Sequence, residues 1–198
     1  MSRPPLPEIE TGRFRLRQLN DDNFDEWASL KYADPVMMRY MPPSELEPLA
    51  RAKSARSFFD ELWSEYGYGA WLVFDKQNDQ LLGDCYLEPE AASESGEVEI
   101  GYDVGRAFWG RGIATEVARA VLRFSFENLA VARILGIVAK DNLGSRRVLE
   151  NLGFEVEQEA ILYGLDAVVY ALSHDRFDPG NAFYRVKRPA EKPGSDET

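Results

Sequence analysis

The sequence contains a single cysteine, Cys85, and a single histidine, His174, among 198 residues. One cysteine cannot form an internal disulfide, and a lone thiol suits a reducing compartment. One histidine leaves no material for a histidine-based metal site or triad, so we expect no metal. No matched base lies near Cys85 in the sequence. We therefore predict that Cys85 is buried and packs like a small apolar side chain, and that His174 lies on the surface.

Long apolar runs and an excess of basic residues are also absent. No segment approaches the ~20 residues of a membrane span, and the proline-rich residues 1–9 have no apolar stretch typical of a signal peptide. Lys and Arg number 23 against 34 Asp and Glu, which gives a net charge of −11. This balance argues against nucleic acid or a membrane surface as the main partner. We expect a cytoplasmic protein.

The apolar pattern predicts one domain over residues 9–188, a lead-in at 1–8 and a polar, disordered tail at 189–198. Helices are expected over 24–32, 46–66, 113–129 and 145–151. A capping box of Ser44 and Glu47 would open the second, and Asp141 or Asn142 would cap the fourth. Strands are expected over 14–19, 70–75, 81–87, 97–104, 131–139, 154–159 and 165–172, with a solvated loop at 91–96. This order predicts an α+β fold with a mixed sheet, in which strands 97–104 and 131–139 are parallel.

Residues 106–115, R-A-F-W-G-R-G-I-A-T, connect the strand at 97–104 to the helix at 113–129. Glycines let a backbone approach a ligand closely. The first N–H groups of a helix have no intrahelical partner and attract anions. The segment is therefore typical of a phosphate-binding turn, and a tight turn without ligand is the alternative. A dinucleotide fingerprint is disfavoured, because Thr115 stands where its third glycine belongs.

Five segments in order resemble one family. They are residues 9–17 (I-E-T-G-R-F-R-L-R), 99–102 (E-I-G-Y), 109–114 (W-G-R-G-I-A), Asn142 with Ser145, and 152–154 (L-G-F). Together they resemble the GNAT superfamily of acyl-CoA N-acyltransferases, in its RimJ/RimL-type branch. The resemblance implies a mostly antiparallel sheet of about seven strands, about four flanking helices, and a splayed parallel strand pair at the coenzyme site.

The resemblance also implies a reaction. Acetyl-CoA, the co-substrate, gives its acetyl group directly to a primary amine in a ternary complex, without a covalent enzyme intermediate. The amine belongs to a protein N-terminus or to a small molecule. A non-catalytic acyl-CoA-binding or interaction module on the same fold is the alternative. Homodimers are common in such folds, and the sequence does not decide this point.

For the coenzyme, the family pattern indicates the loop and its surroundings. The diphosphate is expected beside Trp109, on the backbone of Gly110, Arg111, Gly112, Ile113 and Ala114 and the hydroxyl of Thr115. The pantetheine is expected along Tyr102, Asp103 and Val104, and at Asn142 and Ser145, which helix capping would explain equally well. Arg106 and Arg111 would add charge for the phosphates or lie on the surface. Residues 101–150 carry +3 and the rest of the chain −14, which suits a polyanion here and a cationic acceptor elsewhere, unless both are ordinary surface charge.

Catalysis requires a base for the amine proton and a donor for the leaving thiolate. Glu97 and Glu99 lie two residues apart on one face of the expected strand, where repulsion would raise one pKa. Glu99 is the first candidate for the base, and a solvent-facing strand edge is the alternative. Ser145 is the candidate near the thiolate, because Leu149 stands where many family members carry a tyrosine. The residues expected in an acceptor cleft, or in the core, are Trp27, Tyr32, Arg39, Tyr40 and Met41.

Overall fold

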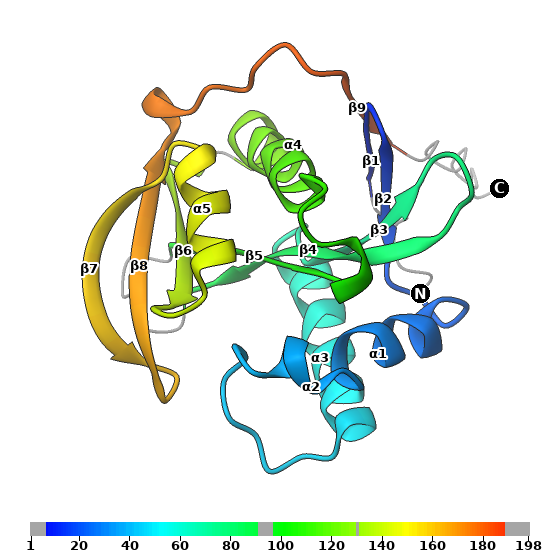
Figure 1. Ribbon diagram of the computed structural model, residues 1–198. Coiled ribbons are helices and arrows are strands. Elements are labelled where there is room, and N and C mark those ends of the chain that lie inside the picture. Colours follow the sequence, from blue (N-terminus) through cyan, green and yellow to red (C-terminus); the bar gives the residue numbers. More distant parts are fainter. Residues whose placement is uncertain (1–6, 91–96, 130, 189–198) are drawn as a thin grey trace, which may run out of the picture.

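The computed structural model describes residues 7–90, 97–129 and 131–188. Within them, nine strands form one sheet with the order β7-β8-β6-β5-β4-β3-β2-β1-β9 (Figure 1). Every neighbouring pair is antiparallel except β5 and β6, which are parallel. This is the mixed, mostly antiparallel sheet that the sequence predicts.

The bounds of the elements are as follows. The strands are β1 (Glu8–Thr11), β2 (Phe14–Gln18), β3 (Ala70–Asp75), β4 (Leu81–Pro89), β5 (Val98–Val104), β6 (Arg133–Ala139), β7 (Glu155–Leu162), β8 (Leu165–Ser173) and β9 (Tyr184–Lys187). The helices are α1 (Phe24–Tyr32), α2 (Pro35–Met38), α3 (Pro48–Glu65), α4 (Ile113–Asn128) and α5 (Leu143–Asn151), with short 3₁₀ turns η1 (Arg106–Phe108) and η2 (His174–Arg176).

The predicted strands and helices are present, with ends that differ by at most three residues. The structure adds α2, β1 and β9. The first two arise locally: Asp34 accepts a hydrogen bond from the N–H of Val36 at the start of α2, and the Thr11 hydroxyl accepts the N–H of Phe14 in the turn between β1 and β2. β9 arises from pairing with β1, which lies at the other end of the sequence.

One helix start differs from the prediction. α3 begins at Pro48, and the expected capping box is absent, since Glu47 occupies the cap position without a side-chain hydrogen bond. The Ser44 hydroxyl instead accepts the N–H of Leu46 at 3.2 Å. Proline suits the first helical position and holds its predecessor out of helical space, which explains the later start. The cap expected at Asn142 is confirmed, because its side chain accepts the N–H of Ser145 at 3.1 Å.

Helices α4 and α5 cover one face of the sheet, and α1–α3 cover the other (Figure 1). Side chains alternate along β4, so Cys85 packs in the core under α4 and α5 while Tyr86 meets Phe59 of α3 at a ring distance of 5.2 Å. Cys85 is fully buried, as predicted. His174 is exposed, as predicted, and stacks on Phe126.

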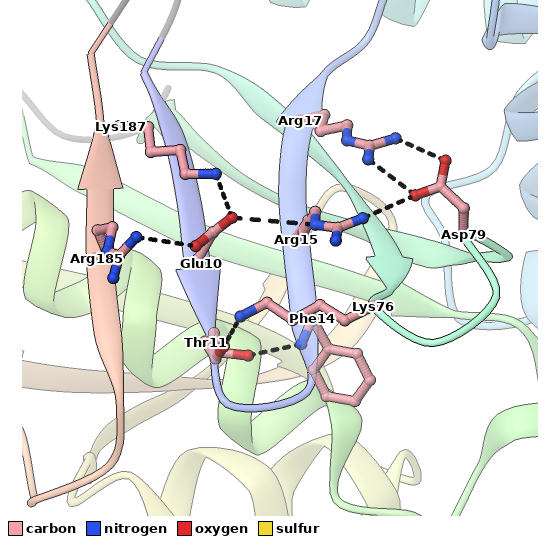
Figure 2. Close-up of polar contacts among 9 residues, drawn as sticks. All are labelled: Glu10, Thr11, Phe14, Arg15, Arg17, Lys76, Asp79, Arg185 and Lys187. Atoms are coloured by element: carbon pink, nitrogen blue, oxygen red, sulfur yellow. Dashed lines mark hydrogen bonds and ion pairs between the residues drawn. The ribbon is translucent and has the colours of Figure 1, made fainter.

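The segment after β8 passes over α4 and places β9 beside β1 (Figure 1). Figure 2 shows the charges that join this edge to the sheet. Glu10 of β1 contacts Lys187 at 2.5 Å and both Arg185 and Arg15 at 4.0 Å, and Arg15 continues to Asp79 at 3.3 Å. The hydrogen bond from Lys187 lowers the pKa of Glu10 despite its burial. These pairs hold a strand of only four residues at the sheet edge.

No helix in the described part of the chain is both long and apolar enough to cross a membrane. The loop expected at 91–96 and the tail expected at 189–198 lie outside the described residues. Residues 1–6 of the expected lead-in do so as well, whereas β1 already begins at Glu8.

Candidate active site

A cleft of about 1130 Å³ opens where the parallel strands part. β5 and β6 pair at Val98 with Ile134 and at Glu99 with Leu135, and the register extends no further, although both strands continue. The splayed pair that the family pattern implies is therefore present. The residues predicted for the coenzyme all line the cleft: Tyr102, Asp103, Val104, Trp109, Gly110, Arg111, Gly112, Ile113, Ala114, Thr115, Asn142 and Ser145.

The turn before α4 has the geometry of an anion site. Gly110 and Gly112 have φ of 75° and 69°, in the left-handed region that a Cβ disfavours. Gly112 caps α4, and the first bond within the helix runs to its carbonyl from the N–H of Glu116 at 3.2 Å. The N–H groups of residues 113–115 therefore have no partner within the helix, and the helix dipole favours an anion before them.

Arg13, in the turn between β1 and β2, holds the outer side of this loop. Its guanidinium donates to the carbonyls of Arg111 at 3.0 Å and Gly112 at 3.4 Å, and its Nε donates to Glu116 at 2.7 Å. Glu116 also accepts the Thr11 hydroxyl at 2.6 Å. Because N–H and C=O point in opposite directions across a trans peptide, the N–H groups that follow these two carbonyls point away from Arg13.

Two hydroxyl groups meet inside the cleft. The Tyr102 hydroxyl lies 2.9 Å from the Ser145 Oγ and donates to the Ser145 carbonyl at 3.0 Å. Burial raises the pKa of Tyr102 above its usual value. Nearby, the Trp109 indole donates to the Val104 carbonyl at 2.6 Å and fixes the end of β5 against the loop. The sequence indicates the Tyr102 backbone and the Ser145 hydroxyl but not the pairing of the two side chains.

Carboxyl groups gather at the point where β5 and β6 part. Glu88 of β4 lies directly opposite Glu99 of β5, so both side chains are on one face of the sheet. Glu99 and Glu90 are 8% and 6% exposed, and the Tyr163 hydroxyl donates to both oxygens of Glu90 at 3.1 and 3.0 Å. Burial raises the pKa of Glu99 well above its usual value, and the neighbouring Glu88 and Glu90 add to the shift.

Two sequence candidates lie elsewhere. Glu97 precedes β5, forms an ion pair with Arg133 and is not among the cleft-lining residues, so the geometry favours Glu99 of the two carboxylates. Arg106 pairs with Asp34 at 3.1 Å and also lies outside the lining, whereas Arg111 belongs to it.

A buried cation supports the cleft. Lys31 of α1 lies 3.0 Å from Asp84 of β4 and 2.7 Å from Asp103 of β5, and the Trp27 indole donates to Asp84 at 2.5 Å. Burial opposes the charge on Lys31, but the two carboxylates raise its pKa well above the usual value. Burial raises the pKa of Asp84 to about 6, so it is ionised at neutral pH. Lys31 thus joins α1 to two strands of the cleft.

The remaining wall of the cleft is largely apolar. Of the residues expected in an acceptor site, Tyr32, Tyr40 and Met41 line the cleft, whereas Trp27 is fully buried. Arg39 lies outside the lining and pairs with Asp141 at 3.1 Å. Further lining side chains come from α2, α3 and the loop between them: Met37, Pro42, Pro43, Leu46, Phe58 and Phe59.

A family model describing the acetyltransferase (GNAT) domain matches residues 13–155. That range runs from the turn that carries Arg13 through the glycine-containing turn before α4 and through α5 to the start of β7. The chain belongs to the GNAT acetyltransferase family. It is therefore an acyltransferase, and the family predicted from the sequence is confirmed.

Relatives and solved structures agree with this GNAT assignment. An uncharacterized N-acetyltransferase of Bacillus licheniformis is 28% identical over 152 residues, 77% of this chain and 84% of that protein. An acetyltransferase structure from Agrobacterium tumefaciens gives a TM-score of 0.74 at 22% identity and covers 85% of this chain and 95% of its own. Mycobacterium smegmatis RimJ in complex with CoA-disulfide gives 0.71 at 20% identity, covering 88% and 91%. These structures share the fold of this chain.

Proposed function

We propose that the protein transfers an acetyl group from acetyl-CoA directly to a primary amine within a ternary complex. One observation carries the proposal: a single cleft joins a phosphate-binding loop, the gap between two splayed strands, and a buried carboxyl cluster. Strand rise of about 3.3 Å per residue puts Glu99 roughly 16 Å from Val104 at the loop end of β5. A coenzyme with a long arm between its phosphates and its thiol suits such a cleft.

The coenzyme would be held mostly by backbone groups. The diphosphate would accept hydrogen bonds from the N–H groups of residues 110–115 at the start of α4. Beyond Glu99, the edge of β5 that faces β6 has no strand partner. The peptide groups of residues 102–104 that face this edge would pair with the pantetheine amides, except the Val104 carbonyl, which accepts the Trp109 indole. RimJ of Mycobacterium smegmatis, which shares the fold, was solved with CoA-disulfide.

The transfer would proceed by direct attack. Proximity of the amine and the thioester carbonyl lowers the barrier, provided that the amine has lost its proton. The carboxyl cluster that contains Glu99 would receive that proton. The paired hydroxyls of Tyr102 and Ser145 would hydrogen-bond the departing thiolate. Leu149, which replaces the tyrosine of many relatives, is 2% exposed in the core and has no proton to give.

The acceptor is a primary amine, on a protein N-terminus or on a small molecule. The acidic cluster favours an amine that arrives as an ammonium ion, and the apolar wall of α2 and α3 favours one with an apolar body. The fold does not name the acceptor more closely. A cytoplasmic location stays a prediction.

Thermal melting with acetyl-CoA, CoA and NAD added separately tests the coenzyme half of this proposal. Ligands that bind the folded state raise the melting temperature by mass action. We expect both forms of CoA at 100 times their Kd to add about 2.7 kcal/mol of stability, and NAD to add none. No shift with acetyl-CoA at millimolar concentration would contradict the site assignment.

A further inference from the structure

Glu88 has a place in the cleft that the sequence did not single out. It lies on β4 opposite Glu99 and lines the cleft. It is partly exposed, whereas Glu90 and Glu99 are buried. Like charges directly opposite each other on a sheet destabilise it. Two carboxylates in this register would repel each other, which favours a proton on one of them.

Burial and the neighbouring carboxyls favour the neutral form of Glu99 and raise its pKa. Tyr163 donates its hydroxyl to the two carboxylate oxygens of Glu90. Glu90 is in turn a hydrogen-bond partner of Glu99, and this bond, together with burial, favours the neutral form of Glu99. This preference for the neutral form makes Glu99 less suited than Glu88 to take a proton from an ammonium ion.

Tyr163 reaches Glu90 from a strained position. It occupies the tip of the hairpin between β7 and β8 with φ of 53°, in the left-handed region that residues other than glycine seldom adopt. The two-residue turn between β7 and β8 accounts for this conformation, because Tyr163 and Gly164, with φ of 76°, both lie in this region. From this position its hydroxyl makes both hydrogen bonds to Glu90 and fixes where that carboxylate lies.

Glu88 differs from its neighbours in having no fixed partner. Within residues 7–90, 97–129 and 131–188, no hydrogen bond or ion pair involves its carboxylate, although Lys31 attracts it from a distance. By contrast, Asp84 and Asp103 are paired with Lys31, and Glu90 with Tyr163. Burial raises the pKa of Glu88 to about 7, against the attraction of Lys31. A group of this kind exchanges protons near neutral pH.

We propose that Glu88 is the catalytic base that takes the proton from the acceptor's ammonium group, and that Glu99, Glu90 and Tyr163 are positioning residues behind it. This inference rests on the proposed acetyl transfer. The Glu88 carboxylate accepts one proton from R–NH₃⁺ and leaves a neutral amine. The nitrogen lone pair forms the C–N bond, the C–S bond breaks, and the second nitrogen proton passes to the thiolate. Glu88 then returns its proton to solvent.

The test compares pH profiles of kcat/KM for the wild type, Glu88→Gln and Glu99→Gln, with an alkylamine that the wild type acetylates. In the wild type we expect kcat/KM to fall on the acid side of a pKa near 7, which is the acid limb of the profile. In Glu88→Gln this limb should be lost, and kcat/KM at pH 7.5 should be roughly 100-fold lower than in the wild type. Glu99→Gln should keep the acid limb, and its kcat/KM should fall less than tenfold. The reason is that the amide of the new side chain can still donate to Glu90. Glu61→Gln, on the exposed side of α3, is the matched surface control.

A second substrate separates a base from a merely structural residue. With an amine whose pKa lies below the assay pH, the nitrogen arrives neutral and needs no base for its first proton. With such an amine, the kcat/KM of Glu88→Gln should be only a few-fold below that of the wild type. Unchanged CoA affinity and melting temperature at pH 5 would confirm that this variant is folded.

Two outcomes would overturn the inference while leaving the proposed function in place. One is loss of the acid limb in Glu99→Gln but not in Glu88→Gln. The other is that Glu88→Gln lowers kcat/KM by the same factor for amines of high and of low pKa. If the wild type binds acetyl-CoA but acetylates no amine, the proposed function itself fails, and the role of Glu88 falls with it.

Discussion

At the scale of single residues, Lys31 has a larger structural role than its place in a short helix indicates. It is 4% exposed, and its charge is matched by the carboxylates of Asp84 and Asp103. Removing one partner of a buried ion pair leaves the other charge desolvated and uncompensated. Nothing in the local sequence indicates this, because the two carboxylates come from strands that are distant in the chain.

We expect Lys31→Met to lower the free energy of unfolding by about 3 kcal/mol at pH 8. The loss should be smaller at pH 5, where Asp84 can take up a proton. Urea denaturation at both pH values measures it, with Lys53→Met on the exposed side of α3 as the control. Equal midpoints for Lys31→Met and the control would show that the buried pair contributes nothing.

At the scale of elements, sequence reasoning succeeded where a signal is local. Apolar periodicity placed α1 and β3 at their observed bounds, and the glycines before α4 indicated the tight turn in which Gly110 and Gly112 have positive φ. It failed where a contact joins distant segments. Arg13 lies 98 residues from Arg111, and Tyr163 lies 73 residues from Glu90. The pairing of Glu88 with Glu99 depends on the register of two strands, which one sequence does not reveal.

The contact between the β1–β2 turn and the coenzyme loop yields a prediction of its own. Arg13→Met removes the donors to the carbonyls of Arg111 and Gly112 while keeping an unbranched side chain. The loop N–H groups should then be less well oriented, and we expect the Kd for CoA to rise roughly tenfold, which corresponds to about 1.4 kcal/mol. Calorimetric titration measures this.

The control for Arg13 is its neighbour on β2. Arg15 pairs with Asp79 and Glu10 and makes no contact with the loop in the described structure. Arg15→Met should bind CoA as the wild type does. If both variants bind alike, Arg13 does not shape the loop.

At the scale of the whole molecule, the raised carboxyl pKa values make stability depend on pH. The pKa of Glu88 is about 7 in the folded protein against an ordinary value of 4.5. A carboxyl whose pKa is raised by folding gives stability that is full below the unfolded pKa and is lost as pH rises through the folded pKa. The pKa of Glu10 and Asp79 is lowered, so their contributions change only at more acidic pH.

The melting temperature should therefore fall as pH rises from 5 to 8. In Glu88→Gln the fall should be smaller, since the amide does not titrate. Calorimetric scans of both proteins at matched ionic strength measure the difference. A melting temperature that rises over this range, or parallel curves for the two proteins, would contradict the assignment of a raised pKa to Glu88.

Acetyl transfer from acetyl-CoA to an amine in one cleft is tested most directly by amine-dependent release of CoA thiol, with the mass of the product, over a panel of peptide N-termini, arylalkylamines and diamines. We expect thiol release that requires an amine, and a product heavier by one acetyl group. Tight binding of acetyl-CoA without thiol release for any amine between pH 6 and 9 would contradict it, and would indicate a coenzyme-binding module instead.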